Sequence, residues 1–233
     1  MGSEAINIEI EGGHKLSGTV VTKTSKNGAM GLLAASLLNR GKTTLKNVPK
    51  IEEVFRIIEV FESIGVKVTW HRNDLEIIPP KEFAMDKLNA IAAERTRSVI
   101  MLIGPLIHSR KKFSLPQAGG CKLGSRTVKP HLFALEKLGV DIKATEKTYE
   151  ISVGTLTPNE IILYEAGDTV TENAIIAAAG IPGTTVIKYA SANYMGQEVC
   201  FFLEKLGVKI EGIGTTTLTV HGLAELNSDV AYE

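Results

Sequence analysis

The sequence predicts an α/β fold made of three similar units that pack about a pseudo-threefold axis, with helices buried inside and sheets outside. Three observations support this prediction: one segment recurs three times, a glycine occupies the same place in every copy, and several helical segments are apolar on nearly every side. The chain has 233 residues, of which 44% are hydrophobic and 22% charged. This composition is typical of globular proteins.

The recurring segment has the pattern Phe/Leu-Glu-x-Ile/Leu-Gly-Val-x-Val/Ile, and its copies lie about 70 residues apart, a spacing too long for a solenoid repeat. The copies begin at Phe61, Leu135 and Leu203. In each of them the glycine is expected to end a helix, because glycine adopts the left-handed backbone conformation without steric cost. These glycines are Gly65, Gly139 and Gly207.

Each unit is predicted to run strand, helix, strand, helix, strand, strand. The first helices are apolar and are expected inside the molecule; they are predicted at 28–38, 99–107 and 174–179, each followed by a strand, at 41–47, 112–115 and 183–188. The helix predicted at 51–64 is amphipathic and is expected to cover a sheet. The closing strand pairs are predicted at 66–70 with 75–78, 140–144 with 149–153, and 208–211 with 217–220.

Charge and cysteine content exclude several classes of protein. The 26 basic and 26 acidic residues give a net charge of zero, so the chain lacks the overall positive field that nucleic-acid binding proteins use, and we predict no nucleic-acid partner. No apolar run approaches the roughly 18 residues that a membrane span needs, so we predict no membrane partner. The two cysteines, Cys121 and Cys200, indicate free thiols and a cytoplasmic location.

The segment from Gly119 to Arg126 is the strongest candidate for chemistry. It places Cys121 among three glycines, and the nearby Lys122 and Arg126 would lower the pKa of its thiol. These features suit a reactive cysteine that meets an anionic substrate, although free cysteines are also often simply buried. Cys200 has apolar neighbours on a predicted helix and is expected in the core.

Two predicted helix starts carry cations. Ser25 is the expected N-cap of the first buried helix, which places Lys26 in the first turn, where the helix dipole disfavours a positive charge. An anion bound at this helix start would explain the lysine, whereas the alternative is a solvated surface side chain. Arg97 precedes the second buried helix in the same way, while the third copy has Thr171-Glu172-Asn173 there. We expect these starts to converge near the axis.

Other motifs are weak. The five histidines are scattered without the spacing of metal ligands, and the glycine-rich segments match neither a P-loop nor a dinucleotide-binding motif. We therefore predict no metal and no cofactor.

Four features together resemble one family. They are Lys26-Asn27 before an Ala/Leu-rich helix, the Asn47-Val-Pro turn, Arg97 eight residues before a proline, and the Gly-Gly-Cys-x-x-Gly-x-Arg loop. This combination resembles UDP-N-acetylglucosamine 1-carboxyvinyltransferase, an enolpyruvyl transferase, over about Ile8 to Leu226. The related 5-enolpyruvylshikimate-3-phosphate synthases are expected to share the repeats but not the Gly-Gly-Cys loop.

The resemblance implies the inside-out α/β barrel fold of the enolpyruvyl transferases, and transfer of the enolpyruvyl group of phosphoenolpyruvate to the 3-hydroxyl of UDP-N-acetylglucosamine. It further implies that Cys121 is the catalytic loop thiol. The substrate-binding residues implied for the two ligands are Lys26, Asn27, Arg97, Arg126, Thr127, Val128, Lys129 and Pro130.

The resemblance also implies a domain organisation. Family members contain two three-unit domains, so residues 1–21 are expected to form strands that pair with a second domain or a complementary chain. Residues 22–226 are expected to form the three-unit domain, and residues 227–233 a tail at the hinge. On this reading the chain carries half of the active site and is inactive alone.

Two alternatives remain open at the level of sequence. Lys129 stands where the family has an acidic residue, and Glu165-Ala-Gly-Asp168 replaces a Ser-Val-Gly-Ala turn. These departures favour a non-catalytic module that binds a nucleotide sugar or regulates another protein. The second alternative is a domain similar to 5-enolpyruvylshikimate-3-phosphate synthase.

Overall fold

The computed structural model describes residues 9–22, 24–117 and 128–233. Its helices are α1 (Lys26–Ser36), α2 (Glu52–Ser63), α3 (Ala90–Glu94), α4 (Ile103–Leu106), α5 (Lys129–Glu136), α6 (Asp168–Ala179) and α7 (Tyr194–Lys205), with 3₁₀ turns η1 (Met85–Lys87) and η2 (Arg97–Leu102). Its strands are β1 (Thr43–Leu45), β2 (Lys67–His71), β3 (Asp74–Ile78), β4 (Lys112–Pro116), β5 (Val140–Ala144), β6 (Thr148–Val153), β7 (Glu160–Ile162), β8 (Gly183–Lys188), β9 (Lys209–Glu211), β10 (Thr217–Gly222) and β11 (Val230–Tyr232).

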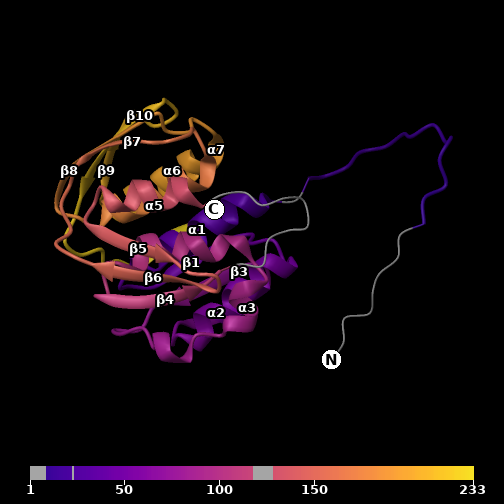
Figure 1. Cartoon of the computed structure of the whole chain (residues 1–233). Helices are drawn as coiled ribbons and strands as arrows, with labels where there is room; N and C mark the ends of the chain where they lie inside the picture. The colour runs from indigo at the N-terminus through magenta and orange to yellow at the C-terminus, as the bar shows by residue number, and fades with distance from the viewer. Residues whose placement is uncertain (1–8, 23, 118–127) are drawn as a thin grey trace.

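The strands form three separate sheets, one for each predicted unit. The sheet orders are β11-β1-β3-β2, β4-β6-β5 and β7-β8-β10-β9. In Figure 1 the strands curve around one side of the molecule, and helices α1, α5, α6 and α7 lie on their inner side. The third unit has the complete predicted order of β7, α6, β8, α7, β9 and β10. The repeat predicted from the sequence is therefore confirmed in the fold.

The C-terminal residues belong to the first unit, which corrects the prediction of a tail over 227–233. Strand β11 pairs in parallel with β1 and takes the place that β7 has beside β8 in the third sheet. The buried side chain of Asn39 fixes this segment, because its amide donates to the Ser228 carbonyl oxygen at 2.8 Å and accepts from the Ser228 N–H at 3.1 Å. Sequence reasoning missed this strand because its partner lies almost 190 residues earlier in the chain.

The second unit differs from the other two. Its sheet has three strands, and no described strand pairs in parallel with β4. The helix predicted at 99–107 is a 3₁₀ turn, η2, followed by the short helix α4. Pro105 explains the change, because proline lacks an N–H and its ring clashes with the carbonyl four residues earlier, at Met101.

The described residues before α1 make no strand. Residues 9–22 are exposed, including Leu16, Val20 and Val21, and this stretch leaves the body of the molecule in Figure 1. The backbone groups of a segment with no neighbouring strand bond to water instead, so such a segment does not form a stable strand. Strands are expected within residues 1–21; residues 1–8 lie outside the described residues, and pairing with a second domain stays a prediction.

The first helices form the centre of the core. Helix α6 packs against α1, α4, α5 and α7, and its residues from Val170 to Ala179 are all buried. Helix α2 is amphipathic as predicted, and it buries one face that includes Val54, Ile57 and Phe61. The three repeat glycines have φ between 93° and 96°, so the predicted left-handed helix ends are confirmed. Within the described residues no helix is long and apolar enough to span a bilayer.

Candidate functional site

A cavity of about 950 Å³ lies where the starts of the three first helices meet. Residues at each start line it. They include Lys26 and Asn27 in the first turn of α1, Arg97 and Ser98 in η2, and Asp168 and Thr169 in α6. The predicted convergence of the helix starts is confirmed, and it gathers charged side chains from all three units into one site.

The start of α1 is built as the sequence predicts. Ser25 is the N-cap, and its hydroxyl accepts a hydrogen bond from the Gly28 N–H at 3.1 Å. Lys26 follows in the first turn, with its side chain half exposed. Its ammonium donates to the Glu53 carboxylate at 2.6 Å. This carboxylate offsets the unfavourable position of Lys26 beside the positive end of the helix dipole.

Glu53 is the residue that sequence reasoning missed. It belongs to the first turn of α2, and besides Lys26 it accepts hydrogen bonds from the hydroxyls of Thr96 at 3.0 Å and Ser98 at 2.7 Å. Burial alone would raise the pKa of Glu53, but the hydrogen bonds from Lys26, Ser98 and Thr96 outweigh burial and lower it. Nothing in the local sequence distinguishes Glu53 from Glu52, which is exposed and faces Arg56.

The start of η2 places Arg97 beside a buried histidine. His131 is 7% exposed, and its ring nitrogens lie 3.2 Å from the Asn173 amide nitrogen and 3.3 Å from the Thr169 hydroxyl. Burial, with a further contribution from the charge of Arg97, lowers the pKa of His131 to about 4. The imidazole is therefore neutral near pH 7 and supplies hydrogen bonds rather than charge to this wall of the cavity.

The third unit begins earlier than predicted. Helix α6 starts at Asp168 after the N-cap Gly167, so Asp168 and not Thr171 is the structural equivalent of Lys26 and Arg97. The carboxylate of Asp168 accepts hydrogen bonds from the Ser191 hydroxyl and, at 3.4 Å, from the Asn193 amide. An acidic residue in the first turn is favoured by the helix dipole. The third start thus offers the cavity a negative charge where the others offer a positive one.

The residues that the sequence aligned with the cationic starts lie one turn deeper and are buried. Asn173 accepts from the Gly104 N–H at 2.9 Å and donates to the Ile100 carbonyl oxygen at 3.2 Å, which joins α6 to η2 and α4. Glu172 is 1% exposed. Burial, and secondarily the charge of Asp168, raises the pKa of Glu172 to about 8. At neutral pH this carboxyl is therefore mostly protonated.

The structure brings together five of the predicted site residues. Lys26, Asn27, Arg97, Val128 and Lys129 line the cavity. Pro130 is buried in the first turn of α5 and is absent from the lining, so its predicted contact with a ligand has no support in this cavity. The remaining three predicted residues, Cys121, Arg126 and Thr127, lie outside the described residues.

Cys200 occupies the core, as predicted. Its side chain is 1% exposed on α7, and burial raises the pKa of its thiol to about 12. A thiol in this state is not a nucleophile near pH 7.

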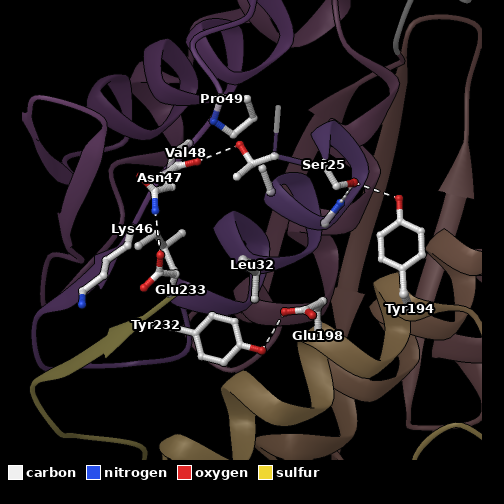
Figure 2. Close-up of a pocket in the computed structure, with 14 residues that line it drawn as sticks. Ser25, Leu32, Lys46, Asn47, Val48, Pro49, Tyr194, Glu198, Tyr232 and Glu233 are labelled. Atoms are coloured by element: carbon white, nitrogen blue, oxygen red, sulfur yellow. Dashed lines mark hydrogen bonds between the residues drawn. The ribbon is translucent and has the colours of Figure 1, made fainter. Parts of the chain in front are cut away.

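A smaller cavity of about 220 Å³ lies against another face of α1. Figure 2 shows that its polar side chains are paired across it: Ser25 with Tyr194 at 2.9 Å, Asn47 with Glu233 at 2.8 Å, and Tyr232 with Glu198 at 2.7 Å. These bonds connect α1, α7 and β11. The larger cavity is the better candidate for a functional site, because it gathers charged residues from the starts of all three first helices.

The larger cavity is suited to an anionic ligand on one wall. Lys26 and Arg97 lie there at two helix starts, and cations beside a helix start recur in phosphate sites. The same lining also includes two acidic residues, Glu165 and Asp168, and a further cation, Lys129. Within the described residues no group of three His, Cys, Asp or Glu side chains could hold a metal ion.

Comparison with known proteins identifies the family of the chain. Curated relatives include the UDP-N-acetylglucosamine 1-carboxyvinyltransferases of Bradyrhizobium diazoefficiens, 36% identical over 217 residues, and of Treponema denticola, 35% identical over 218 residues. These alignments cover 93% and 94% of this chain but only 50% and 51% of the relatives. The chain therefore spans about half the length of the relatives it matches.

Solved structures show the same fold. The enolpyruvyl transferase NikO from Streptomyces tendae superposes with a TM-score of 0.79 at 21% identity, covering 95% of this chain and 52% of NikO. The EPSP synthase from Acinetobacter baumannii gives a TM-score of 0.69 at 17% identity, with 92% and 49% covered. The family model for EPSP synthase (3-phosphoshikimate 1-carboxyvinyltransferase) matches residues 10–232. The chain therefore belongs to the EPSP synthase family of carboxyvinyl transferases.

Proposed function

We propose that this chain forms half of the active site of an enolpyruvyl transferase, which transfers the enolpyruvyl group of phosphoenolpyruvate to the 3-hydroxyl of UDP-N-acetylglucosamine. The observation that carries the proposal is the convergence of Lys26, Asn27 and Arg97 on one cavity at two helix starts. The names of the curated relatives support the choice of acceptor. The proposal includes a role in peptidoglycan synthesis and a cytoplasmic location.

In this proposal the main catalytic contribution comes from cationic side chains that bind phosphoenolpyruvate. The ligand carries a phosphate and a carboxylate, and loss of its phosphate concentrates negative charge on the departing group. Preorganised cations stabilise that developing charge without a reorganisation cost. Lys26 binds the phosphate, Asn27 reaches the sugar nucleotide, and Arg97 lies in the cleft near the sugar nucleotide. Cys121 supplies the loop thiol and Arg126 a further cation. Thr127, Val128 and Lys129 border the uridine site.

Lys26 provides the direct test. Lys26→Ala should weaken phosphoenolpyruvate binding about 10- to 100-fold, because a charge-assisted hydrogen bond contributes about 1.5–3 kcal/mol. Isothermal titration calorimetry on the 233-residue chain, with UDP-N-acetylglucosamine present, measures this. The matched control is Lys42→Ala, which removes a lysine paired with Glu76 away from the cavity. Equal affinity in the wild type and Lys26→Ala would contradict the assignment.

Turnover decides whether half a site is enough. We expect no phosphate release from phosphoenolpyruvate and UDP-N-acetylglucosamine by the isolated chain, and release when a second three-unit domain is supplied. Robust steady-state turnover by the 233-residue chain alone would overturn the half-site proposal.

The acidic groups at Glu165 and Asp168 favour a second candidate, a non-catalytic nucleotide-sugar-binding or regulatory module. Fosfomycin distinguishes the two candidates, because the epoxide alkylates a reactive thiol. The transferase proposal expects Cys121 to be labelled much faster than Cys200, whose buried thiol is an internal reference. Labelling of neither thiol, together with ligand binding, would support the module. Binding of shikimate 3-phosphate in place of UDP-N-acetylglucosamine would support a synthase of the shikimate type.

A further inference from the structure

Glu53 differs from its neighbour Glu52 in what its side chain contacts. It and Glu52 both lie in the first turn of α2, where acidic residues complement the helix dipole. Glu52 is exposed, whereas Glu53 turns toward the cavity and contacts two other elements, α1 through Lys26 and η2 through Thr96 and Ser98. One carboxylate therefore links the two helix starts that carry the cations of the site.

The contact between Lys26 and Glu53 can be exchanged. The Lys26 side chain is half exposed and the Glu53 side chain is 24% exposed, and ion pairs this open to water contribute little to stability. A phosphate group offers the same ammonium up to two negative charges and additional acceptor oxygens. If Lys26 turns to such a ligand, Glu53 keeps its two hydroxyl donors, Thr96 and Ser98, and is not left without hydrogen bonds.

We propose that Glu53 is the internal counter-ion of the anion site: its carboxylate holds the Lys26 ammonium while the cavity is empty and yields it to the phosphate group of an incoming ligand. Thr96 and Ser98 keep the displaced carboxylate in place. This inference rests on the proposed function only in requiring that a phosphate-bearing ligand binds at Lys26. In this role Glu53 is a positioning residue that weakens phosphate binding, whereas the cations of the site strengthen it.

The test is the affinity of inorganic phosphate for Glu53→Gln in the 233-residue chain, measured by calorimetry at fixed ionic strength. Glutamine keeps the size of the side chain and still accepts from Thr96 and Ser98, but it removes the charge that competes for Lys26. We expect phosphate to bind about 3- to 10-fold more tightly, because the variant lacks the negative charge of Glu53 that repels the phosphate. The matched control is Glu59→Gln, which changes a carboxylate of the same helix that pairs with Arg56.

A second measurement does not depend on a variant. Carboxyl-carbon NMR of the wild-type chain should show a shift of the Glu53 signal on phosphate addition, with Glu59 unchanged as an internal reference. Equal or weaker phosphate affinity in Glu53→Gln, or a Glu53 signal that does not move, would overturn the inference.

The two proposals fail in different ways. If phosphate binding is lost in Lys26→Ala but is equal in the wild type and Glu53→Gln, the anion site stands and only the role of Glu53 is wrong. If phosphate binds neither the wild type nor Glu53→Gln, the anion site itself is wrong, and the inference fails with it.

Discussion

The starts of α1 and α6 occupy equivalent places in two units and carry opposite charges. Helix α1 has a side-chain cap from Ser25 and no acidic residue in its first turn, where Lys26 lies. Helix α6 has no side-chain cap, and Asp168 occupies its first turn. The first start needs Glu53 of another helix to offset its cation, whereas the third complements its own dipole. A repeated backbone thus leaves the chemistry of each start free to differ.

The two helices also differ one turn further in. Ser36 is the one polar residue among the buried positions of α1, while α6 buries the larger polar side chains of Glu172 and Asn173. The helices meet where Gly31 faces Glu172, and a Cβ atom at Gly31 would lie only 2.9 Å from the Glu172 carboxylate. The buried polar groups are therefore concentrated in α6, and variants in α6 and at the start of α1 test how much each helix contributes to stability.

The largest effect is expected at Asn173. Asn173→Ala removes the acceptor of the Gly104 N–H and the donor to the Ile100 carbonyl oxygen, both buried. Two unpaired backbone groups should lower the free energy of unfolding by about 3 kcal/mol. Urea denaturation measures this loss, with Asn227→Ala at an exposed loop position as the control. A loss below about 1 kcal/mol would show that Asn173 does not hold α6 to η2 and α4.

An intermediate effect is expected from Glu172. Its pKa is about 8 in the folded chain and near 4.5 when unfolded, so between these values the folded state binds an extra proton and stability falls as the pH rises. The histidines whose pKa burial lowers, His108 and His131, contribute on the acid side, as stability lost when the pH falls below about 6.5. The range from pH 6.5 to 8 therefore reports mainly on Glu172.

In that range the wild type should lose about 2 kcal/mol, since each pH unit contributes about 1.4 kcal/mol. Glu172→Gln, which is neutral at every pH, should abolish this slope and be more stable than the wild type at pH 8. Thermal or urea unfolding at pH 6.5 and 8 measures both. An unchanged slope in Glu172→Gln would mean that Glu172 is ionised in the folded chain.

The smallest effect is expected at the N-cap of α1. Ser25→Ala removes the hydrogen bond to the Gly28 N–H and the contact with the Tyr194 hydroxyl, and should cost about 1 kcal/mol. Tyr194→Phe, which removes only the second contact, should cost less. If both variants unfold at the same urea concentration as the wild type, the cap at α1 contributes nothing, and the contrast with α6 reduces to charge alone.

Local patterns predicted most of the secondary structure. Helix ends at Gly65, Gly139 and Gly207, the strands that follow them, and the cap at Ser25 all depend on residues within a few positions, and all are confirmed. The apolar run at 174–179 predicts a later start for α6 than the observed one at Asp168, because the residues of its first two turns are mostly polar. The true first turn at Asp168 follows a glycine cap with no side-chain signal.

Long-range contacts could not be predicted. The pairing of β11 with β1, the bond of Lys26 to Glu53, and the joint use of Glu53 by Thr96 and Ser98 connect residues far apart in the sequence. Glu53 has the same local context as Glu52, so only the packing of α2 beside η2 distinguishes the two carboxylates.

The sequence by itself determined the three-unit repeat, its helix-ending glycines, and the presence of Lys26 and Arg97 at two helix starts, because backbone conformation and apolar periodicity are local properties. The tertiary structure alone decided that Asp168 joins these cations in the cavity, that Glu53 binds Lys26, and that Glu172 is buried. Burial and charge pairing depend on which segments meet in space, and that is set by packing the three units together.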